Sequence, residues 1–252
     1  MSQKKPKISR TTSTINAKEI QQFDSLGAKW WDESGPMGPL HKLNPVRLDY
    51  IKRTACEHFA LPAGFKSLQK LKIADIGCGG GLLTEPLARL GATVTGVDAG
   101  KENIKVAAAH AKAAGLDIEY VATSAEALAA SGRKFDIVTA LEIVEHVDNV
   151  DVFIKALARL VKPGGLLIMS TPNRTAKSYM LGIIAAEYIL RWLPVGTHDW
   201  KKFLKPSELA AHITANGLDI TDVCGMTYSP ATRRFALSKS DVSVNYLLTA
   251  VK

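Results

Sequence analysis

The stretch DIGCGGG at residues 75–81 stands between an apolar run, LKIADI, and a helical pattern, LLTEPLARL. The apolar run has the length and composition of a buried strand. Glycines directly after a strand allow a tight turn and a close approach of the backbone to a ligand, and the first turn of a following helix presents unpaired N–H groups. The stretch therefore predicts a strand, a turn and a helix that form one edge of a binding site.

The same alternation of strand and helix continues to the end of the chain. Further strands are expected at 92–98, 117–122, 135–141 and 165–171, with closing strands at 218–226 and 244–252. Helical patterns occupy 101–115, 149–161 and 207–217, and the region before residue 70 is helical without a strand pattern. Strands that alternate with helices indicate βαβ units and a parallel sheet. The expected fold class is α/β.

The residues around the glycines limit the choice of ligand. A dinucleotide site has the pattern G-x-G-x-x-G, which Gly77 and Gly79 fit and Leu82 breaks. The carboxylate of Asp75, ahead of the first glycine, repels a pyrophosphate but suits the cationic end of S-adenosylmethionine. Asp98 ends the next strand, where it can accept hydrogen bonds from both hydroxyls of a ribose. A turn with a helix cap and no ligand is the alternative interpretation.

The composition is that of a soluble globular protein. The 252 residues are 46% hydrophobic and 22% charged, enough for one large domain or two small ones. The three cysteines show no pairing or zinc-type spacing, which favours a reducing compartment. No apolar run reaches the roughly 18 to 20 residues that span a bilayer. The start, MSQKKPKISRTTSTINAK, lacks a signal-peptide core and is expected to be disordered, with a transit peptide as the alternative.

The net charge of +8 is concentrated in two segments. Residues 1–19, the predicted disordered basic tail, hold five basic residues and one acidic residue. Residues 173–205 hold six basic and two acidic residues, so each segment carries a net charge of +4 and the rest of the chain is neutral. Charge placed in this way suits either nucleic acid or an anionic membrane surface.

A second set of reactive side chains lies in LEIVEHV, residues 141–147. Glu142, Glu145 and His146 are spaced i, i+3 and i+4, so on a helix they would share one face. Two carboxylates and a neutral imidazole can hold a divalent cation. His146 can instead act as a general base, because the pKa of histidine suits neutral pH. A histidine that caps a helix is the third interpretation.

These motifs resemble a known family. DIGCGGG followed by GVD is similar to motif I of the class I S-adenosylmethionine-dependent methyltransferases, a signal that is specific at the level of the superfamily. FDSLGAKWWDESGPMGPLHKLNPVRLDYI, at 23–51, resembles the N-terminal signature of the ubiquinone biosynthesis O-methyltransferases. LEIVEHV, STPNRT and GTHDWKKFLKPSEL extend the resemblance over residues 20–252.

The resemblance implies a fold and an activity. Residues 20–252 would form a single methyltransferase domain with a Rossmann-like fold, N-terminal helices and an inserted helical lid at 173–205. Its seven-stranded, mostly parallel sheet would end in an antiparallel strand. The implied enzyme uses S-adenosylmethionine to methylate phenolic hydroxyls of 2-polyprenyl-6-hydroxyphenol and 3-demethylubiquinol, at both O-methylation steps of ubiquinone biosynthesis. Another small-molecule phenol methyltransferase is the alternative.

The resemblance also assigns cofactor roles to single residues. Arg47 would bind the methionine carboxylate through its two-pronged guanidinium. Gly77, Gly79 and Asp98 would keep the cofactor-binding roles argued above, and Leu141 would lie beside the cofactor. Many relatives carry an acid near the adenine after the third strand. Here the sequence reads ATSAEAL, which leaves Ser124 and Glu126 as two open candidates.

For the second set, the resemblance implies that Glu142, Glu145 and His146 hold a divalent cation. Mg²⁺ is expected, with Zn²⁺ or Mn²⁺ as alternatives because of the imidazole. A bound cation can lower the pKa of a phenol as a Lewis acid. Glu142 and His146 are then also the expected catalytic residues, and without a metal His146 is the expected general base.

The inserted segment suggests contact with a membrane. AKSYMLGIIAAEYILRWL, at 176–193, is apolar, but Glu187 and Arg191 lie inside it and it is too short to cross a bilayer. An amphipathic helix in the membrane interface is expected, and a helix buried on the domain or in a dimer is the alternative. The basic residues expected to face lipid headgroups are Arg174, Lys177, Arg191, Lys201 and Lys202.

Partners and location follow from this reading. The expected partners are a lipid-soluble polyprenyl phenol, a membrane surface and other enzymes of ubiquinone biosynthesis, with no nucleic acid. The expected location is cytoplasmic and peripheral on the inner face of a bacterial membrane, or the matrix side in a mitochondrion. Two rival functions are a nucleotide-dependent oxidoreductase, disfavoured by Leu82, and a non-catalytic membrane- or RNA-binding protein with this fold. The intact set of Asp75, Gly77 and Asp98 argues against the second rival.

Overall fold

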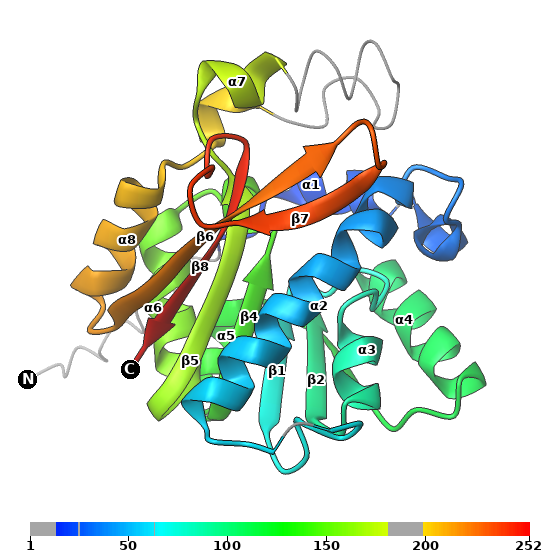
Figure 1. The fold of residues 1–252 in the computed structure, drawn as a ribbon. Helices are drawn as coiled ribbons and strands as arrows, with labels where there is room; N and C mark the ends of the chain where they lie inside the picture. The colour runs from blue at the N-terminus through cyan, green and yellow to red at the C-terminus, as the bar shows by residue number, and fades with distance from the viewer. Residues whose placement is uncertain (1–13, 25, 63, 181–198) are drawn as a thin grey trace, which may run out of the picture.

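The computed structural model describes residues 14–24, 26–62, 64–180 and 199–252. Its strands form one sheet in the order β3-β2-β1-β4-β5-β8-β6-β7 (Figure 1). The strands are β1 Lys72–Ile76, β2 Thr93–Asp98, β3 Glu119–Ala122, β4 Phe135–Leu141, β5 Val161–Pro172, β6 Asp219–Ser229, β7 Arg234–Ser238 and β8 Asn245–Val251. The longer helices that accompany them are α2 Gly38–His58, α3 Thr84–Arg89, α4 Lys101–Ala113, α5 Ala125–Ala130, α6 Val150–Leu160 and α8 Pro206–Ala215.

The sheet confirms the predicted class I methyltransferase topology. The neighbouring strands from β3 to β5 pair in parallel, and β8 runs antiparallel between β5 and β6. The sheet has eight strands where seven were expected, because β7 pairs antiparallel with β6 at the edge. The sequence of β7, RFALS, alternates exposed and half-buried residues, which is typical of an edge strand that covers one face. Helix α5 was also not predicted, since its six residues are too few for a clear helical period.

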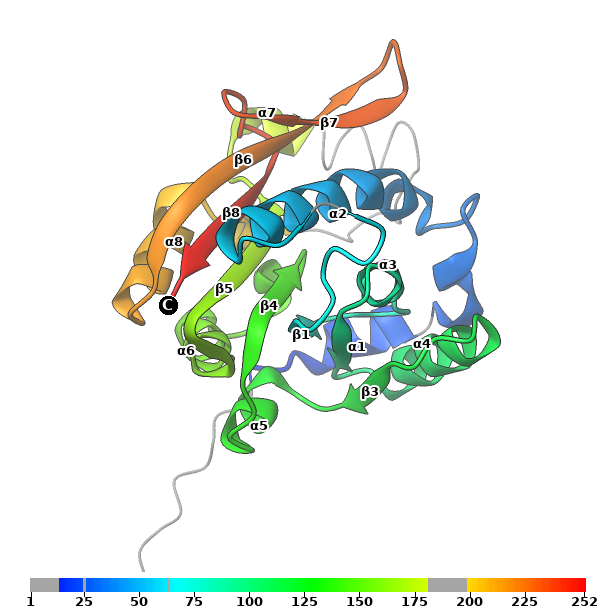
Figure 2. The same ribbon diagram turned by 60° about the horizontal axis from the view of Figure 1, so that its bottom comes forward.

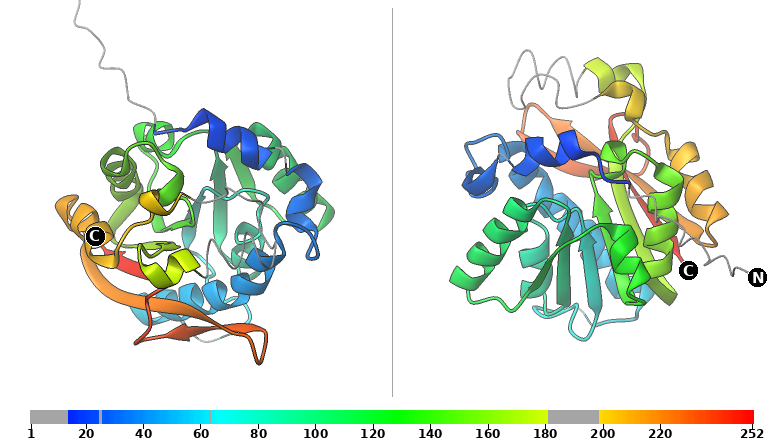
Figure 3. Two further views of the ribbon diagram at one scale, coloured as in Figure 1. Left: turned by 90° about the horizontal axis from the view of Figure 1, so that it is seen from above. Right: turned by 180° about the vertical axis from the view of Figure 1, so that it is seen from behind.

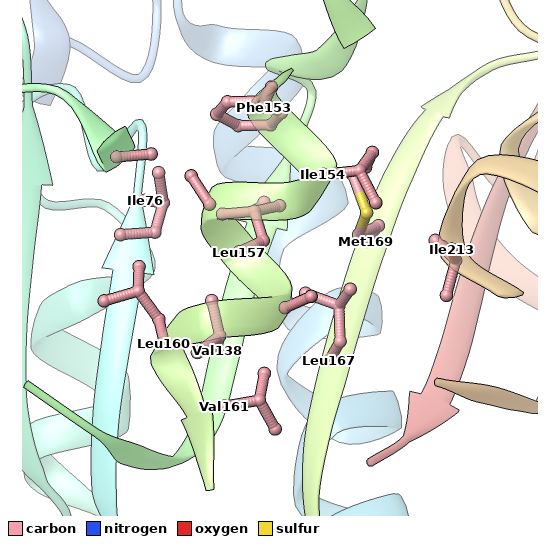
Figure 4. Close-up of a cluster of buried hydrophobic side chains, with 14 of the residues drawn as sticks. Ile76, Val138, Phe153, Ile154, Leu157, Leu160, Val161, Leu167, Met169 and Ile213 are labelled. Atoms are coloured by element: carbon pink, nitrogen blue, oxygen red, sulfur yellow. The ribbon is translucent and has the colours of Figure 1, made fainter. Parts of the chain in front are cut away.

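Two apolar cores lie on opposite faces of the sheet, as the two-residue period of a strand requires. On one face, Ile137 of β4 and Leu166 of β5 pack with residues of α2 and α3. On the other face, the next residues along the strands, Val138 and Leu167, pack with α5, α6 and α8. Figure 4 shows this second core, with side chains of α6 pointing toward β4 and β5, among them Phe153, Ile154, Leu157 and Leu160.

The chain before β1 is helical, as predicted. It consists of α1 Ala17–Asp24, the 3-10 helix η1 Gly27–Trp31 and the long helix α2. Figure 3 shows α1, in blue, across the upper end of the sheet, and Figure 2 shows α2 along one side of it. The predicted tail boundary at residue 19 needs correction. Helix α1 starts inside the tail, and the buried hydroxyl of Thr14 donates a hydrogen bond to Glu126, which ties this part of the chain to α5.

Only the ends of the inserted segment 173–205 belong to the described residues. They contain the short helix α7 Ala176–Ser178 and the 3-10 helix η4 Trp200–Lys202, whereas most of the predicted interfacial helix at 176–193 lies outside them. Within the described part of the chain, no helix is long and apolar enough to cross a membrane.

Candidate active site

A cavity of about 760 Å³ lies at the carboxyl ends of the parallel strands. The last residues of β1, β2, β4 and β5 line it, which is the edge where open α/β sheets bind ligands. Residues of α1, η1 and α2 line it from the N-terminal part of the chain. Most of the predicted site residues meet here: Arg47, Gly77, Gly79, Asp98, Leu141, Glu142 and His146. Glu145 is buried nearby, with 3% of its surface exposed, and does not line the cavity.

The glycine loop has the backbone that the sequence predicted. Gly77 and Gly79 have φ values of +74° and +51°, in the region that favours glycine. A Cβ atom at Gly79 would lie 2.4 Å from the ring of Trp30, and one at Gly77 would lie 2.3 Å from Ile143. The loop therefore needs glycine partly because other parts of the protein pack against it. Trp30 covers the loop and donates a hydrogen bond from Nε1 to Asn103 at 2.9 Å.

Asp98 connects the end of β2 to this loop. One carboxylate oxygen accepts a hydrogen bond from the N–H of Gly79 at 3.0 Å, and the other accepts from the N–H of Gly100 at 2.7 Å and from Asn103 at 3.2 Å. Burial raises the pKa of Asp98 above its ordinary value. Each carboxylate oxygen has two lone pairs, so these three bonds leave one acceptor site, on the oxygen that is bonded to Gly79, for a ribose hydroxyl. A second ribose hydroxyl would have to replace one of the present donors.

Asp75 has a structural role that the sequence did not predict. Its carboxylate is buried and accepts hydrogen bonds from the hydroxyls of Thr84 at 2.7 Å and Thr139 at 2.8 Å. These contacts join β1 to α3 and to β4. Burial raises the pKa of Asp75, and the two hydroxyls oppose that effect. Asp75 also lines the cavity. Its attraction for the cationic end of a ligand stays a prediction.

Arg47 projects from α2 and is 6% exposed. Its Nη2 lies 3.0 Å from Oε1 of Glu142. The buried Nε has no hydrogen-bond partner among the residues that the structure describes. An unsatisfied buried donor on a guanidinium that lines the cavity fits a carboxylate ligand, because the uncompensated group would otherwise cost about 1–3 kcal/mol or more. The donor set therefore fits the methionine end of S-adenosylmethionine.

The segment LEIVEHV is not a continuous helix, which corrects the premise that its three polar side chains share one helical face. Glu142 has a φ of +52°, and only residues 144–146 form a short 3-10 helix, η2. The positive φ turns the chain sharply after β4. Glu142 then accepts hydrogen bonds from Ser170 at 2.5 Å and from Asn245 at 2.9 Å, in addition to its ion pair with Arg47.

Glu145 and His146 have different surroundings. Glu145 accepts a hydrogen bond from Thr171 at 2.9 Å, but its buried Oε1 has no hydrogen-bond partner in the described structure. Burial, and then the negative charge of Glu142, raise the pKa of Glu145 to about 7. Burial lowers the pKa of His146, but a hydrogen bond to Glu19 and the nearby carboxylates outweigh it, so the pKa is raised.

The three predicted metal ligands thus contact other groups of the protein. Glu142 pairs with Arg47, Glu145 accepts a hydrogen bond from Thr171, and His146 pairs with Glu19. Among the residues that the structure describes, no three His, Cys, Asp or Glu side chains are placed to hold a metal ion. Two carboxylates and an imidazole nevertheless fit a divalent cation chemically. The unpaired buried oxygen of Glu145 is a structural feature that favours such an ion.

The structure separates the two candidates for the adenine contact. Ser124 is the N-cap of α5 and accepts a hydrogen bond from the N–H of Ala127 at 3.1 Å. Glu126 is 6% exposed, and its Oε2 has no hydrogen-bond partner in the part of the chain described. Both residues line the cavity. Only Glu126 therefore presents a buried, unsatisfied acceptor.

Several site residues were missed by the sequence analysis. Glu19 of α1 pairs with His146 and with Lys202, and Phe23 lies edge-on to the His146 ring at 5.2 Å. Trp30 lies in the quoted N-terminal signature, which gave it no role. Nothing in the local sequence marks these residues, because their partners are distant along the chain.

The basic residues near the insertion also have protein partners. Arg174 pairs with Glu208, and Lys177 pairs with Asp241. Lys202 lies 3.1 Å from Glu19. Three of the residues expected to face lipid headgroups therefore already contact carboxylates.

Known proteins resemble the chain over nearly its whole length. The family described as "Methyltransferase domain" matches residues 74–169. A ubiquinone biosynthesis O-methyltransferase of Bartonella bacilliformis is 52% identical over 242 residues, which cover 96% of this chain and 97% of that protein. Another, of Rhizobium leguminosarum bv. trifolii, is 50% identical over 239 residues and covers 94% of each.

Solved structures share the fold. An S-adenosylmethionine-dependent methyltransferase from Clostridium acetobutylicum has a TM-score of 0.61 and 16% identity over 82% of this chain and 91% of that chain. Magnesium protoporphyrin IX methyltransferase from Synechocystis, with bound SAH, has a TM-score of 0.57 and 23% identity over 82% and 81%. At these identities the likeness concerns the fold alone.

Proposed function

The chain belongs to the ubiquinone biosynthesis O-methyltransferases, and from this premise we propose how its residues bind the substrates and move the proton. The protein is an S-adenosylmethionine-dependent O-methyltransferase. One observation carries the assignment of residues. A single cavity brings together the guanidinium of Arg47, the glycine loop with Asp98, and the imidazole of His146.

The cofactor would be held at three points. Arg47 Nε is a buried donor for the methionine carboxylate, Asp98 accepts from the ribose hydroxyls, and Oε2 of Glu126 accepts from the adenine amino group. When bound, S-adenosylmethionine supplies an electrophilic methyl group that a phenolate oxygen can attack in line. Trp30 covers the glycine loop and keeps water from that side of the site. Leu141, at the end of β4, provides an apolar contact beside the cofactor.

The proton of the phenol would pass to His146. Glu19 can only accept a hydrogen bond, so Nδ1 of His146 must carry the hydrogen in their 3.0 Å contact. That contact fixes the neutral tautomer whose Nε2 has a lone pair, as a base requires. Glu142 positions Arg47 through their ion pair. The catalytic role expected of Glu142 stays a prediction. Orientation of the phenol and its deprotonation supply most of the acceleration that the protein can provide.

The proposed acceptors are polyprenyl phenols at both O-methylation steps, 2-polyprenyl-6-hydroxyphenol and 3-demethylubiquinol. The support is the printed name of relatives about half identical to the chain. The test is methyl transfer from labelled S-adenosylmethionine to each acceptor by the purified protein. Methylation of both is expected, with none in a His146→Ala variant that still binds the cofactor. Product from other small phenols but from neither of these would replace the assignment.

A divalent cation held by Glu142, Glu145 and His146 is a further proposal. It is favoured by the unpaired buried Oε1 of Glu145 and by the charge of Glu142, which a cation would offset. A bound cation would lower the pKa of the phenol as a Lewis acid. The three side chains would have to exchange present partners for the ion, so the base mechanism of His146 is the one argued from the observed contacts.

We also propose that the protein works at the inner face of a membrane, since a polyprenyl substrate resides in lipid, and that other ubiquinone-biosynthesis enzymes are partners. The support is the apolar, basic-flanked segment 176–193, most of which lies outside the described residues. Tyr179 and Met180 lie in the described first part of this segment, and they are 45% and 62% exposed. Deletion of 176–193 should abolish binding to anionic liposomes and leave cofactor affinity unchanged. Equal binding by the deletion variant would remove the membrane role.

A further inference from the structure

The cavity continues past the cofactor-binding residues, between α2 and the hairpin formed by β6 and β7. Its lining there is mostly apolar on both sides, with Asn44 of α2 and Thr227 of β6 as polar members. The apolar residues from α2 are Pro39, Leu40 and Leu43, and those from the hairpin are Met226, Tyr228, Pro230 and Phe235. Charged lining residues on this side are Lys177 and Asp241, whose charges offset one another at 2.7 Å, and the exposed Arg233, at the turn of the hairpin. This part of the cavity therefore suits a hydrocarbon ligand, which gains by leaving water.

The register of the hairpin explains its apolar wall. Met226 pairs with Leu237, and Tyr228 pairs with Phe235. Residues directly opposite in an antiparallel pair point to the same face, so these four side chains form one surface. Met226 is 2% exposed and belongs to the same core as Leu43 of α2, while the rings of Tyr228 and Phe235 lie 5.0 Å apart. The face that carries these side chains is thus directed toward α2.

Strand β7, the eighth strand, is what completes this wall. Without it, β6 would present Met226 and Tyr228 as a single edge strand with unpaired backbone groups. Phe235 comes from β7 itself. The feature that departs from the expected seven-stranded sheet is therefore also the feature that encloses the apolar end of the cavity.

The passage leads toward α7. Asp241, just after β7, contacts Lys177, and the hydroxyl of Thr175 donates to the carbonyl of Ser243 at 2.6 Å. Figures 1 and 2 show the hairpin and α7 on the same side of the molecule. The exposed side chains of Tyr179 and Met180 lie at the end of α7, so an apolar chain that left the passage would emerge beside apolar surface.

We propose that the passage between α2 and the β6–β7 hairpin binds the polyprenyl tail of the acceptor and makes the enzyme select long-tailed substrates. This inference rests on the proposed function. Polar groups that can hold the cofactor and the phenol gather at the strand ends, and the apolar walls beyond them match only the tail. Met226, Tyr228 and Phe235 of the hairpin, with Leu40 and Leu43 of α2, are the residues that determine this preference.

The test compares two acceptors with the same aromatic head, one without a tail and one with a long prenyl tail in detergent micelles. Phe235→Asp places a charge inside the passage. Ala236→Asp is the matched control. Ala236 is exposed and follows Phe235 in β7, so its side chain points to the opposite face of the sheet from Phe235. Phe235→Asp should raise KM for the long-tailed acceptor roughly tenfold or more, because a carboxylate is costly in apolar surroundings. KM for the tailless acceptor and the dissociation constant for S-adenosylmethionine should stay within about twofold, and Ala236→Asp should change neither.

A second variant, Leu40→Gln, alters the opposite wall and decides the case if Phe235→Asp does not fold. It should also raise KM for the long-tailed acceptor selectively. An equal rise for both acceptors would show that the walls contact the aromatic head, and no rise for the long-tailed acceptor would show that the tail leaves elsewhere. Either result overturns the proposal. Turnover of the tailless acceptor by the parent protein tests the proposed function separately.

Discussion

Glu19 of helix α1 lies 3.0 Å, through Oε2, from Nδ1 of His146, and its Oε1 lies 3.1 Å from Nζ of Lys202. The hydrogen bond to His146 is the largest of the effects that lower the pKa of Glu19 to about 2, so the carboxylate stays charged at neutral pH. A helix that precedes the sheet in the chain thus provides the negative charge that orients the imidazole and raises its pKa. Glu19 acts as a positioning residue for His146.

Replacement of Glu19 should shift the pH dependence of turnover. His146 accepts a proton only when it is neutral, so activity should rise with pH through its raised pKa. Glu19→Gln removes a negative charge from the ring, so the pKa of His146 should fall and the acid limb of kcat should move to lower pH. The measurement is kcat against pH for parent and variant, with cofactor affinity as the control. An unmoved acid limb would mean that His146 is not the group that titrates.

The glycine loop predicts a contrast between two glycines. Gly79→Ala should lower both stability and cofactor affinity, because φ is +51° and the new Cβ would meet Trp30 at 2.4 Å. Gly132→Ala is the control, since its φ is +79° but no atom lies within 4 Å of the new Cβ. Both variants should lose about 1–3 kcal/mol from backbone strain. Only Gly79→Ala should weaken S-adenosylmethionine binding, as measured by calorimetry beside thermal melts. Equal affinity in the two would show that the Trp30 contact does not shape the site.

Asp98 should matter to the cofactor more than to the fold. Asp98→Ala removes the expected ribose contacts and frees the N–H of Gly79 that the carboxylate now holds. Loss of charge-assisted hydrogen bonds should cost about 1.5–3 kcal/mol, or roughly ten- to 150-fold in affinity. Asp98→Asn, which keeps one acceptor oxygen, should lie between the parent and the alanine variant. Titration with S-adenosylmethionine measures both, and unchanged affinity would remove Asp98 from the site.

The proposed contact with the adenine amino group can be tested by substitutions at two nearby residues, Glu126 and Ser124, which have different contacts. Glu126→Ala removes the unpaired buried Oε2 and should weaken S-adenosylmethionine binding about tenfold. Ser124→Ala removes the N-cap of α5 and should cost about 1 kcal/mol of stability with little change in affinity. A cofactor analogue without the adenine amino group should bind parent and Glu126→Ala alike. If that analogue still discriminates, Glu126 acts through its contact with Thr14 instead.

Metal removal tests the proposed cation. Exhaustive chelation should stop turnover, and Mg²⁺ should restore it more fully than Zn²⁺ or Mn²⁺. Glu145→Gln should weaken cation binding, measured directly by calorimetry with the metal alone, because it neutralises the buried carboxylate with the unpaired oxygen. Full activity in chelator, with no metal in elemental analysis of the protein, would leave proton transfer to His146 alone.

Most of the fold could be predicted from local patterns. The strands from β1 to β5, the helices between them except α5, and the glycine loop each have their signal within a few consecutive residues. The family resemblance added roles for Arg47 and Leu141, which composition and spacing do not mark. The predicted cofactor residues then met in one cavity because parallel strands end at the same edge of a sheet.

The sequence by itself determined the α/β class and the site at the carboxyl edge, and through its resemblance to a known family it indicated the methyltransferase activity. The tertiary structure decided which residues complete that site. Thr14 reaches Glu126, Glu19 reaches His146 and Trp30 covers Gly79, all through contacts between distant parts of the chain. It also decided that Glu142 turns out of β4 with a positive φ, where spacing alone suggested a helix. The reason is physical. Secondary structure follows short-range periodicity, whereas hydrogen bonds and packing across the site depend on how distant segments are brought together.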